Sequence, residues 1–250
     1  MTVVAVLADP PREGLVLPAL AETSPLTESE AAECYAAMLK DVLVAVERSG
    51  GDLLVNYRPD DLLPEEYVTD TSAEAELRAL AASALDDVSE ARFEPQVGST
   101  FSARAGNTVT HLLREEGVTS AAAVRGNAPF LARTIVDSAA MKLRRSPVVL
   151  GPSTDGRVYY AAFTEPVDFE NAYHDPAVET LTDRGRDAGH EVDYIPMTPV
   201  VERGEDLLTA LPFLSARLAA ERIVPAYTAA FVDELGLHVV GDERRVARAD

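Results

Sequence analysis

Lysine is almost absent from this chain of 250 residues, since only Lys40 and Lys142 occur, and tryptophan does not occur at all. Lysine and arginine together number 22 against 42 aspartates and glutamates, which gives a formal net charge of −20. A field of this sign repels phosphate backbones, so we do not expect DNA or RNA as a partner. The acidic, lysine-poor composition is typical of halophilic archaea, because at molar salt a Debye length of roughly 3 Å screens the self-repulsion.

Cysteine and long apolar runs are also scarce. Cys34 is the only cysteine, so the chain cannot form an internal disulfide, and a cytoplasmic location is expected. The longest apolar runs, such as residues 3–8 and 121–124, are far too short to span a bilayer. No basic segment precedes the first of them, so it reads as a buried strand and not as a signal peptide. The motifs of a P-loop, a GxGxxG fingerprint and a nucleophile elbow are absent, and the four histidines lack zinc-like spacing.

Strand-like apolar runs alternate along the chain with segments of helical periodicity. The stretch Thr27-Glu28-Ser29-Glu30 predicts a capping box, and apolar residues then recur at 3.6-residue spacing up to Val46. The whole pattern predicts a three-layer α/β fold, with a mostly parallel sheet and helices on both faces. We expect one domain over residues 1–240, with 237–240 as a last edge strand, and a charged, poorly ordered tail over 241–250.

Ligands of open α/β sheets bind at the carboxyl ends of the strands, so the loops there are the candidate sites. After the first strand, Asp9-Pro10-Pro11-Arg12-Glu13-Gly14 could wrap a nucleotide, with Arg12 supplying charge and Gly14 a close backbone approach. Farther along, Arg104 and Asn107 stand one turn apart near the start of a helix, where an anion could bind. The plain structural alternative for the first stretch is an ordinary turn. For the second it is a helix cap with a surface arginine.

Two further loops carry polar groups at the same predicted edge. Asn127, after the fourth strand, offers a neutral oxygen ligand for a metal, or else caps a helix beginning at Pro129. Asp155 lies in the loop 151–157, where a carboxylate could hold a cation or accept a proton, although Asp-Gly is also a common turn.

Taken in order, these stretches resemble a family of small prokaryotic proteins with the GT-A glycosyltransferase-like fold. The family is related to nucleotidyltransferases such as 2-phospho-lactate guanylyltransferase. The resemblance covers roughly residues 3 to 210. Its motifs are the proline-glycine loop after strand one, Gln96-Val97-Gly98 leading to Arg104, Gly-Pro-x-x-Asp-Gly at 151–156, and Val201-Glu202-Arg203-Gly204-Glu205-Asp206-Leu207, which is similar to the family's V-D-T-P-E-D-L signature.

Several positions depart from the family pattern. Asp9 and the apolar Leu15-Val16-Leu17-Pro18 stand where the family carries a lysine and a basic K-T-R-L-type stretch. Family aspartates after the fourth strand fall on Asn127 and Phe130, and Arg157 replaces a glycine. These changes weaken the case for ordinary nucleotide-sugar transfer.

The resemblance implies a glycosyltransferase or nucleotidyltransferase acting on a nucleotide or nucleotide sugar. Asp155 would be the catalytic carboxylate, and Mg²⁺ or Mn²⁺ would be held by Asn127, Asp155 and Glu202. The residues expected to bind the nucleotide are Asp9, Pro11, Arg12, Gly14, Arg104 and Asn107. The alternative is a degenerate, non-catalytic homologue that binds a ligand or a protein partner through the same cleft. The oligomeric state is not predicted.

Overall fold

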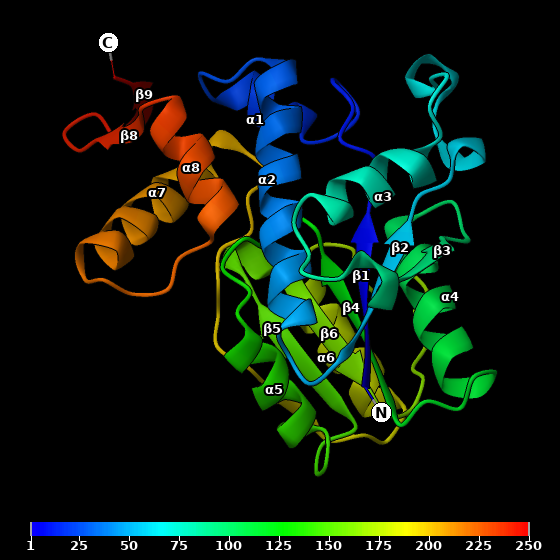
Figure 1. The fold of residues 1–250 in the computed structure, drawn as a ribbon. Coiled ribbons are helices and arrows are strands. Elements are labelled where there is room, and N and C mark those ends of the chain that lie inside the picture. The colour runs from blue at the N-terminus through cyan, green and yellow to red at the C-terminus, as the bar shows by residue number, and fades with distance from the viewer. Residues whose placement is uncertain (1, 250) are drawn as a thin grey trace.

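The first apolar run forms an inner strand of a seven-stranded sheet in the computed structural model, which describes residues 2–249 (Figure 1). The sheet order is β3-β2-β1-β4-β6-β5-β7, and only β6 runs antiparallel to its neighbours. The predicted mostly parallel sheet is therefore confirmed. Its strands are β1 (Thr2–Ala8), β2 (Asp52–Tyr57), β3 (Arg92–Pro95), β4 (Ser120–Arg125), β5 (Val148–Pro152), β6 (Val158–Phe163) and β7 (Val192–Tyr194).

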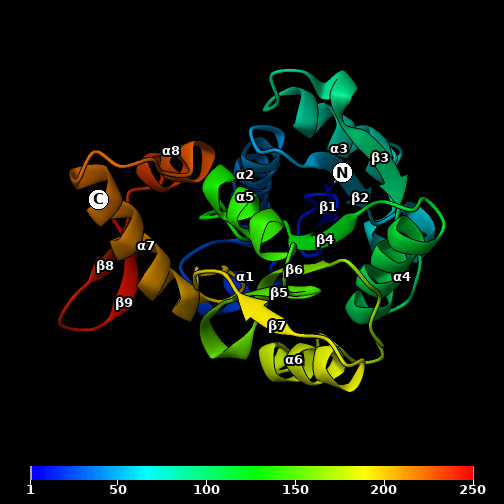
Figure 2. The same cartoon turned by 90° about the horizontal axis from the view of Figure 1, so that it is seen from below.

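Helices cover both faces of this sheet (Figure 2). Alternate side chains of β1 enter two separate apolar clusters, because successive residues of a strand point to opposite faces. Val4 and Val6 pack with α2 (Glu28–Glu47), α3 (Ala73–Ala82) and α5 (Arg133–Lys142). Val3 and Ala5 pack on the other face with α4 (Phe101–Arg114) and α6 (Ala177–Asp187). The three-layer prediction is confirmed.

The C-terminal elements gather beside α2 and away from the sheet (Figure 1). They are α7 (Gly204–Ala219), α8 (Ala226–Glu234), β8 (Leu237–Val240) and β9 (Arg245–Arg248), and α1 (Pro18–Thr23) joins them in a third apolar cluster. Asp41 of α2 accepts hydrogen bonds from the backbone N–H groups of Tyr227 (3.0 Å) and Thr228 (2.8 Å), and so caps the first turn of α8 from outside that helix.

The structure corrects the expectation for the end of the chain. Leu237–Val240 does not join the edge of the main sheet but pairs with β9 in a separate two-stranded sheet. The segment expected to be a poorly ordered tail contains β9, and Arg248 forms an ion pair with Glu30 at the start of α2. That carboxylate lies 218 residues earlier in the chain, so local sequence gives no sign of the contact.

Local signals at helix starts had mixed success. The capping box is present: Thr27 accepts from the N–H of Glu30, whose carboxylate accepts from the N–H of Thr27. The helix predicted from Pro129 instead begins at Arg133, so Asn127 does not cap it. Short 3₁₀ turns span Asp60–Leu62, Glu65–Tyr67, Val88–Glu90 and Thr154–Gly156.

Among residues 2–249, no helix is both long and apolar enough to cross a membrane.

Candidate functional site

A cleft opens where the loops after β1 and β4 separate. The chain continues from β1 to β2 on one side, whereas β4 lies on the other side, so these two strands flank a topological switch point of the sheet. The cleft has a volume of about 320 Å³. It is lined by Leu7, Asp9, Leu15, Val16, Leu17, Pro18, Ala19, Tyr35, Phe101, Arg125, Gly126, Asn127, Glu202 and Arg203. A hollow of similar size at the amino ends of β1 and β4 lies at the sheet edge that ligands of this fold class do not use.

Two arginines lie near Phe101, and of the two only Arg125 itself lines the cleft. The guanidinium carbon of Arg125 lies 4.6 Å from the centre of the Phe101 ring, and that of Arg104 lies 6.0 Å from it. Arg104 is 8% exposed, and its Nε has no hydrogen-bond acceptor among the described residues. Burial lowers the pKa of Arg104, which the nearby Asp9 carboxylate partly counteracts. A buried donor without an acceptor is costly, and in native structures it commonly marks a site that a ligand completes.

Asp9 begins the loop after β1, and its carboxylate is partly buried near two arginines, Arg58 and Arg104. Its Oδ1 is buried without a hydrogen bond from the described residues, and Arg58 Nη1 lies 3.7 Å from it. Burial raises the pKa of Asp9, while the charges of Arg58 and Arg104 act in the opposite direction. Asp9 and Phe101 both line the cleft, and Arg58, Arg104 and Arg125 lie near one or the other. These three arginines make this part of a very acidic chain locally cationic.

Arg12 has a role that differs from the expected phosphate contact. It is buried, and all five of its N–H groups have acceptors: Glu76, Asp60, and the carbonyl oxygens of Tyr67 and Thr71. No donor remains for a phosphate. The side chain instead fastens the first loop to the segment around α3.

The other predicted nucleotide-binding residues also shape loops. The Asn107 amide donates to the carbonyl oxygen of Val97 at 2.7 Å, and this contact holds the loop before α4. Gly14 has a φ of +74°, and a Cβ at this position would meet the Tyr67 ring at 3.3 Å. Pro11 is half-buried in the same turn. Of the six residues predicted to bind the nucleotide, only Asp9 lines the cleft.

The two predicted metal ligands Asn127 and Glu202 lie together at the cleft. The Asn127 amide donates to the carbonyl oxygen of Val201 at 3.0 Å and to Glu202 Oε1 at 3.4 Å. Arg125 Nη1 donates to the same Glu202 oxygen at 2.6 Å. The Asn127 amide nitrogen therefore faces the carboxylate, and Arg125 occupies the position beside it.

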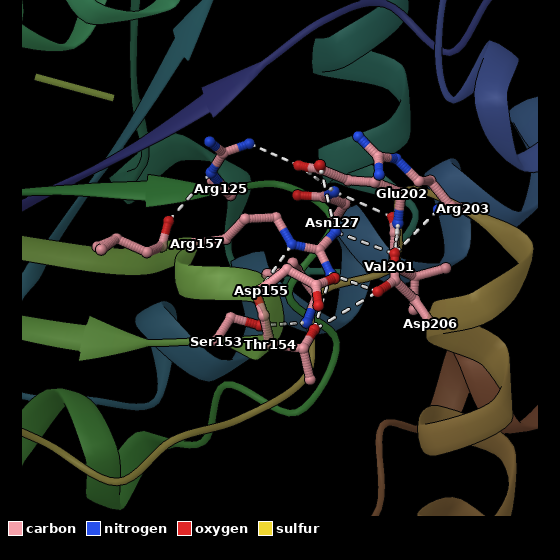
Figure 3. Close-up of polar contacts among 12 residues, drawn as sticks. Arg125, Asn127, Ser153, Thr154, Asp155, Arg157, Val201, Glu202, Arg203 and Asp206 are labelled. Atoms are coloured by element: carbon pink, nitrogen blue, oxygen red, sulfur yellow. Dashed lines mark hydrogen bonds and ion pairs between the residues drawn. The ribbon is translucent and has the colours of Figure 1, made fainter. Parts of the chain in front are cut away.

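Arg157 lies among the carboxylates that were expected to hold a cation (Figure 3). Its Nη2 is 3.2 Å from Asp155 Oδ2, and its Nη1 is 3.3 Å from Glu202 Oε2 and 3.0 Å from Asp206 Oδ2. Nη2 also forms a close ion pair with Asp206 Oδ1. The predicted convergence of Asp155 and Glu202 is thus observed, but a guanidinium lies between them.

This arrangement does not fit Mg²⁺ or Mn²⁺. Hard divalent cations require several oxygen ligands at roughly 2.0–2.6 Å, whereas here the guanidinium fills the space between the oxygens. In the part of the chain that the structure describes, no group of three or more His, Cys, Asp or Glu side chains is arranged to hold a metal ion. The arrangement of Asn127, Asp155 and Glu202 around Arg157 therefore does not fit the ligand set that the sequence predicted for a cation.

Sequence reasoning missed the residues that dominate the cleft. Arg125 is the last residue of β4, next to the position at which acidic ligands were sought, and Asp206 lies in the first turn of α7. Asp206 is 4% exposed and accepts from the backbone N–H groups of Glu202 and Arg203, each at 2.9 Å. Burial alone would raise the pKa of Asp206, but its bonds with Arg157 and these N–H groups hold it below the ordinary value. The signal available was Arg157, the basic residue that stands where the family pattern has a glycine.

Comparisons with known proteins give the fold. No family model matches the chain, and no curated protein matches its sequence. A crystal structure from Desulfovibrio desulfuricans G20, provisionally named a nucleotide-diphospho-sugar transferase, aligns over 93% of this chain and 97% of its own, with a TM-score of 0.72 and 18% identity. A cytidylyltransferase from Leptospira borgpetersenii aligns over 93% and 94% (TM-score 0.50, 9% identity). A 4-diphosphocytidyl-2C-methyl-D-erythritol synthase aligns over 84% and 95% (TM-score 0.50, 12% identity). The chain therefore has the mostly parallel α/β fold seen in nucleotide-diphospho-sugar transferase-like proteins.

Proposed function

We propose that this protein is a nucleotide-dependent transferase that binds the diphosphate of a nucleotide-activated substrate in the cleft at the carboxyl ends of β1 and β4. The observation that carries the proposal is the pair of guanidinium groups, Arg104 and Arg125, which lie 6.0 Å and 4.6 Å from the centre of the Phe101 ring. The D. desulfuricans structure supports it through the fold, and its assigned name concerns the same class of donor.

The chemistry of the pair suits a diphosphate. Guanidinium groups present several N–H donors in a planar fork, which matches the oxygens of a phosphate in a bidentate manner. Arg125 uses Nε and Nη1 on the Val158 carbonyl oxygen and Glu202, and its Nη2 has no hydrogen-bond partner among the described residues. In glycosyl or nucleotidyl transfer, negative charge collects on the departing phosphate oxygens, so fixed cations beside them stabilise the transition state.

The opposite wall of the cleft is apolar. It comes from Leu15, Val16 and Leu17, which follow the first loop. A base or sugar ring can pack against such a wall, while the arginines receive the charged end of the ligand. This division of the cleft supports an amphiphilic ligand over a free inorganic anion.

Asp155 is our candidate for the catalytic carboxylate. Its side chain is 72% exposed, whereas those of Glu202 and Asp206 are 27% and 4% exposed, so it is the one of the three most open to an acceptor. Asp155 also has a φ of 57°, in the left-handed region that aspartate tolerates better than most residues. In an active enzyme, Asp155→Asn should abolish turnover with an unchanged melting temperature.

A second candidate function is ligand binding without catalysis. The engagement of Arg157 with all three carboxylates favours it, because those oxygens already have a cationic partner. The two functions differ in whether a nucleotide sugar is consumed. Incubation with nucleotide sugars and candidate acceptors, followed by ³¹P NMR for released nucleoside phosphates, separates them.

The binding step common to both functions is tested by melting temperature. A ligand at 100 times its Kd stabilises the native state by about 2.7 kcal/mol, which for a chain of this size raises Tm by roughly 5–11 °C. We expect such a rise with at least one of ADP, GDP, CDP or UDP for the wild type. It should be lost in Arg104→Gln and kept in Arg114→Gln, a charge-matched change at the exposed far end of α4. If no nucleoside diphosphate raises Tm, or if both variants respond like the wild type, the proposal is wrong.

A further inference from the structure

The loop between β5 and β6 holds an arginine whose hydrogen-bonding capacity is completely used. Beyond the ion pairs given above, Arg157 Nε donates to the carbonyl oxygen of Thr154 at 3.1 Å, and Nη2 donates to Thr154 Oγ1 at 2.7 Å. The side chain is 6% exposed. Arg157 therefore has no N–H group left for a substrate, and its charge acts on the protein's own carboxylates.

The positive charge of Arg157 lies at the point where three carboxylates converge. Asp155, Glu202 and Asp206 come from two separate loops and from the first turn of α7, and their carboxylates share Arg157 as a common partner (Figure 3). Three carboxylates brought together without a cation would repel one another strongly in a partly buried site. An internal cation is consequently a requirement of this geometry.

We propose that Arg157 is a built-in cation that takes the place of a divalent metal at this edge of the sheet, so that the cleft functions without Mg²⁺ or Mn²⁺. Unlike a metal, the guanidinium is covalently attached and cannot be removed by a chelator. The burial of Arg157 disfavours its charged form, but the ion pairs with Asp206 and Glu202 outweigh this and raise its pKa above the ordinary value. The charge is thus permanent across the pH range in which the protein is folded.

The arginines of this region have different roles, which follow from the same contacts. Arg157 neutralises carboxylates and is a positioning residue, whereas Arg104 and Arg125 are the residues proposed to bind the ligand. Glu202 connects the two groups, because Oε1 accepts from Arg125 and Oε2 from Arg157. Arg157 therefore fixes the carboxylate that orients Arg125.

The test is whether removing Arg157 creates a metal site. We would titrate Mn²⁺ into the protein in 1 M KCl without nucleotide, and follow free Mn²⁺ by electron paramagnetic resonance. The salt suppresses diffuse binding to the acidic surface. The wild type should bind no stoichiometric Mn²⁺, whereas Arg157→Ala should bind about one equivalent. Arg157→Lys, which keeps the positive charge, should behave like the wild type.

Two controls isolate the effect. Arg133→Ala removes the same charge from an exposed ion pair with Asp137, where no other carboxylates converge, and it should gain no Mn²⁺ site. Arg157→Ala with Glu202→Gln should lose most of the gained affinity, since one charged ligand is removed. Gain of binding in Arg133→Ala to the same extent as in Arg157→Ala would overturn the proposal, as would a folded Arg157→Ala variant that binds no Mn²⁺.

Arg157→Ala leaves Asp206 without its buried partner, which destabilises the variant. A second measurement, made on the wild type, tests the proposal even if this variant does not fold. Stoichiometric Mn²⁺ binding by the wild type alone contradicts the proposal outright. In a further arm, which rests on the proposed function, the nucleoside diphosphate that raises Tm should have the same Kd in EDTA and in Mn²⁺ within about twofold. A Kd at least tenfold tighter with Mn²⁺ would also overturn the proposal. The Mn²⁺ titrations contain no nucleotide, so their outcome stays separate from a failure of nucleotide binding.

Discussion

Replacing Arg104 with methionine should separate ligand binding from folding. A buried donor without an acceptor costs about 1–3 kcal/mol, and Arg104 Nε is such a donor in the described chain. Methionine is flexible and apolar and can fill the same space without this cost. The opposing loss is the attraction to Asp9, whose side chain is 35% exposed and keeps Arg58 at 3.7 Å. No ion pair joins Arg104 to Asp9 among the described residues, and Arg58 stays beside Asp9 in the variant, so the lost attraction is on the order of 1 kcal/mol.

The gain from removing the unpaired donor is larger than the lost attraction to Asp9. Without ligand, Arg104→Met should therefore be more stable than the wild type by about 1–2 kcal/mol, or roughly 2–8 °C in Tm for a chain of this size. The assay is thermal unfolding followed by circular dichroism in 2 M KCl, with and without the nucleoside diphosphate that stabilises the wild type. The variant should show the higher Tm but no rise with the ligand. An Arg104→Met variant that is less stable and still responds to the ligand would refute the reasoning, because Arg104 would then be a structural residue.

Further predictions follow from other contacts of the fold. Asp206→Asn, which breaks a buried pair with Arg157, should cost about 3–5 kcal/mol in the urea-derived free energy of unfolding. The folded-state pKa of Asp206 lies below its ordinary value of 3.8, so its contribution to stability is present above that pH and is lost as pH falls through the folded pKa. This acid-dependent part should be missing in the variant. Asp41→Ala should cost about 1–3 kcal/mol and speed amide hydrogen exchange at the start of α8, whereas unchanged exchange would exclude the capping role. With a net charge of −20, Tm should rise from low salt to molar KCl, and a Tm that is unchanged or lower in molar KCl would contradict the salt-adaptation hypothesis.

Much of the fold could be predicted because its signals are local. The strand Asp52–Tyr57 has the predicted bounds, and β1 differs by one residue, since a continuous apolar run between turn residues reports a buried strand directly. Thr27 and Glu30 are three residues apart, so their capping box is visible in the sequence. The order of strands and helices then fixes the layers, because connections in such sheets follow few topologies.

The candidate site could be predicted only in location. The loops after β1 and β4 and the residues Asp155 and Glu202 do meet at one edge, as general rules for parallel sheets require. What each arginine contacts could not be predicted, because the partners are distant in sequence. Arg12 reaches acceptors 48 to 64 residues away, and Arg157 reaches Asp206 across 49 residues.

The strand β9 was missed for a similar reason. A charged segment near the end of a chain favours disorder on composition alone. Pairing with β8 and the ion pair between Arg248 and Glu30 depend on where α2 lies, and this is a property of the assembled fold.

A crystal structure with the stabilising nucleoside diphosphate, grown in EDTA, tests the central claim most directly. The account predicts that the diphosphate oxygens contact Arg104 and Arg125 beside Phe101, with Arg157 still between Asp155, Glu202 and Asp206. A diphosphate bound away from this cleft would contradict it. So would a parallel crystal grown in Mn²⁺ in which a cation displaces Arg157 from the three carboxylates.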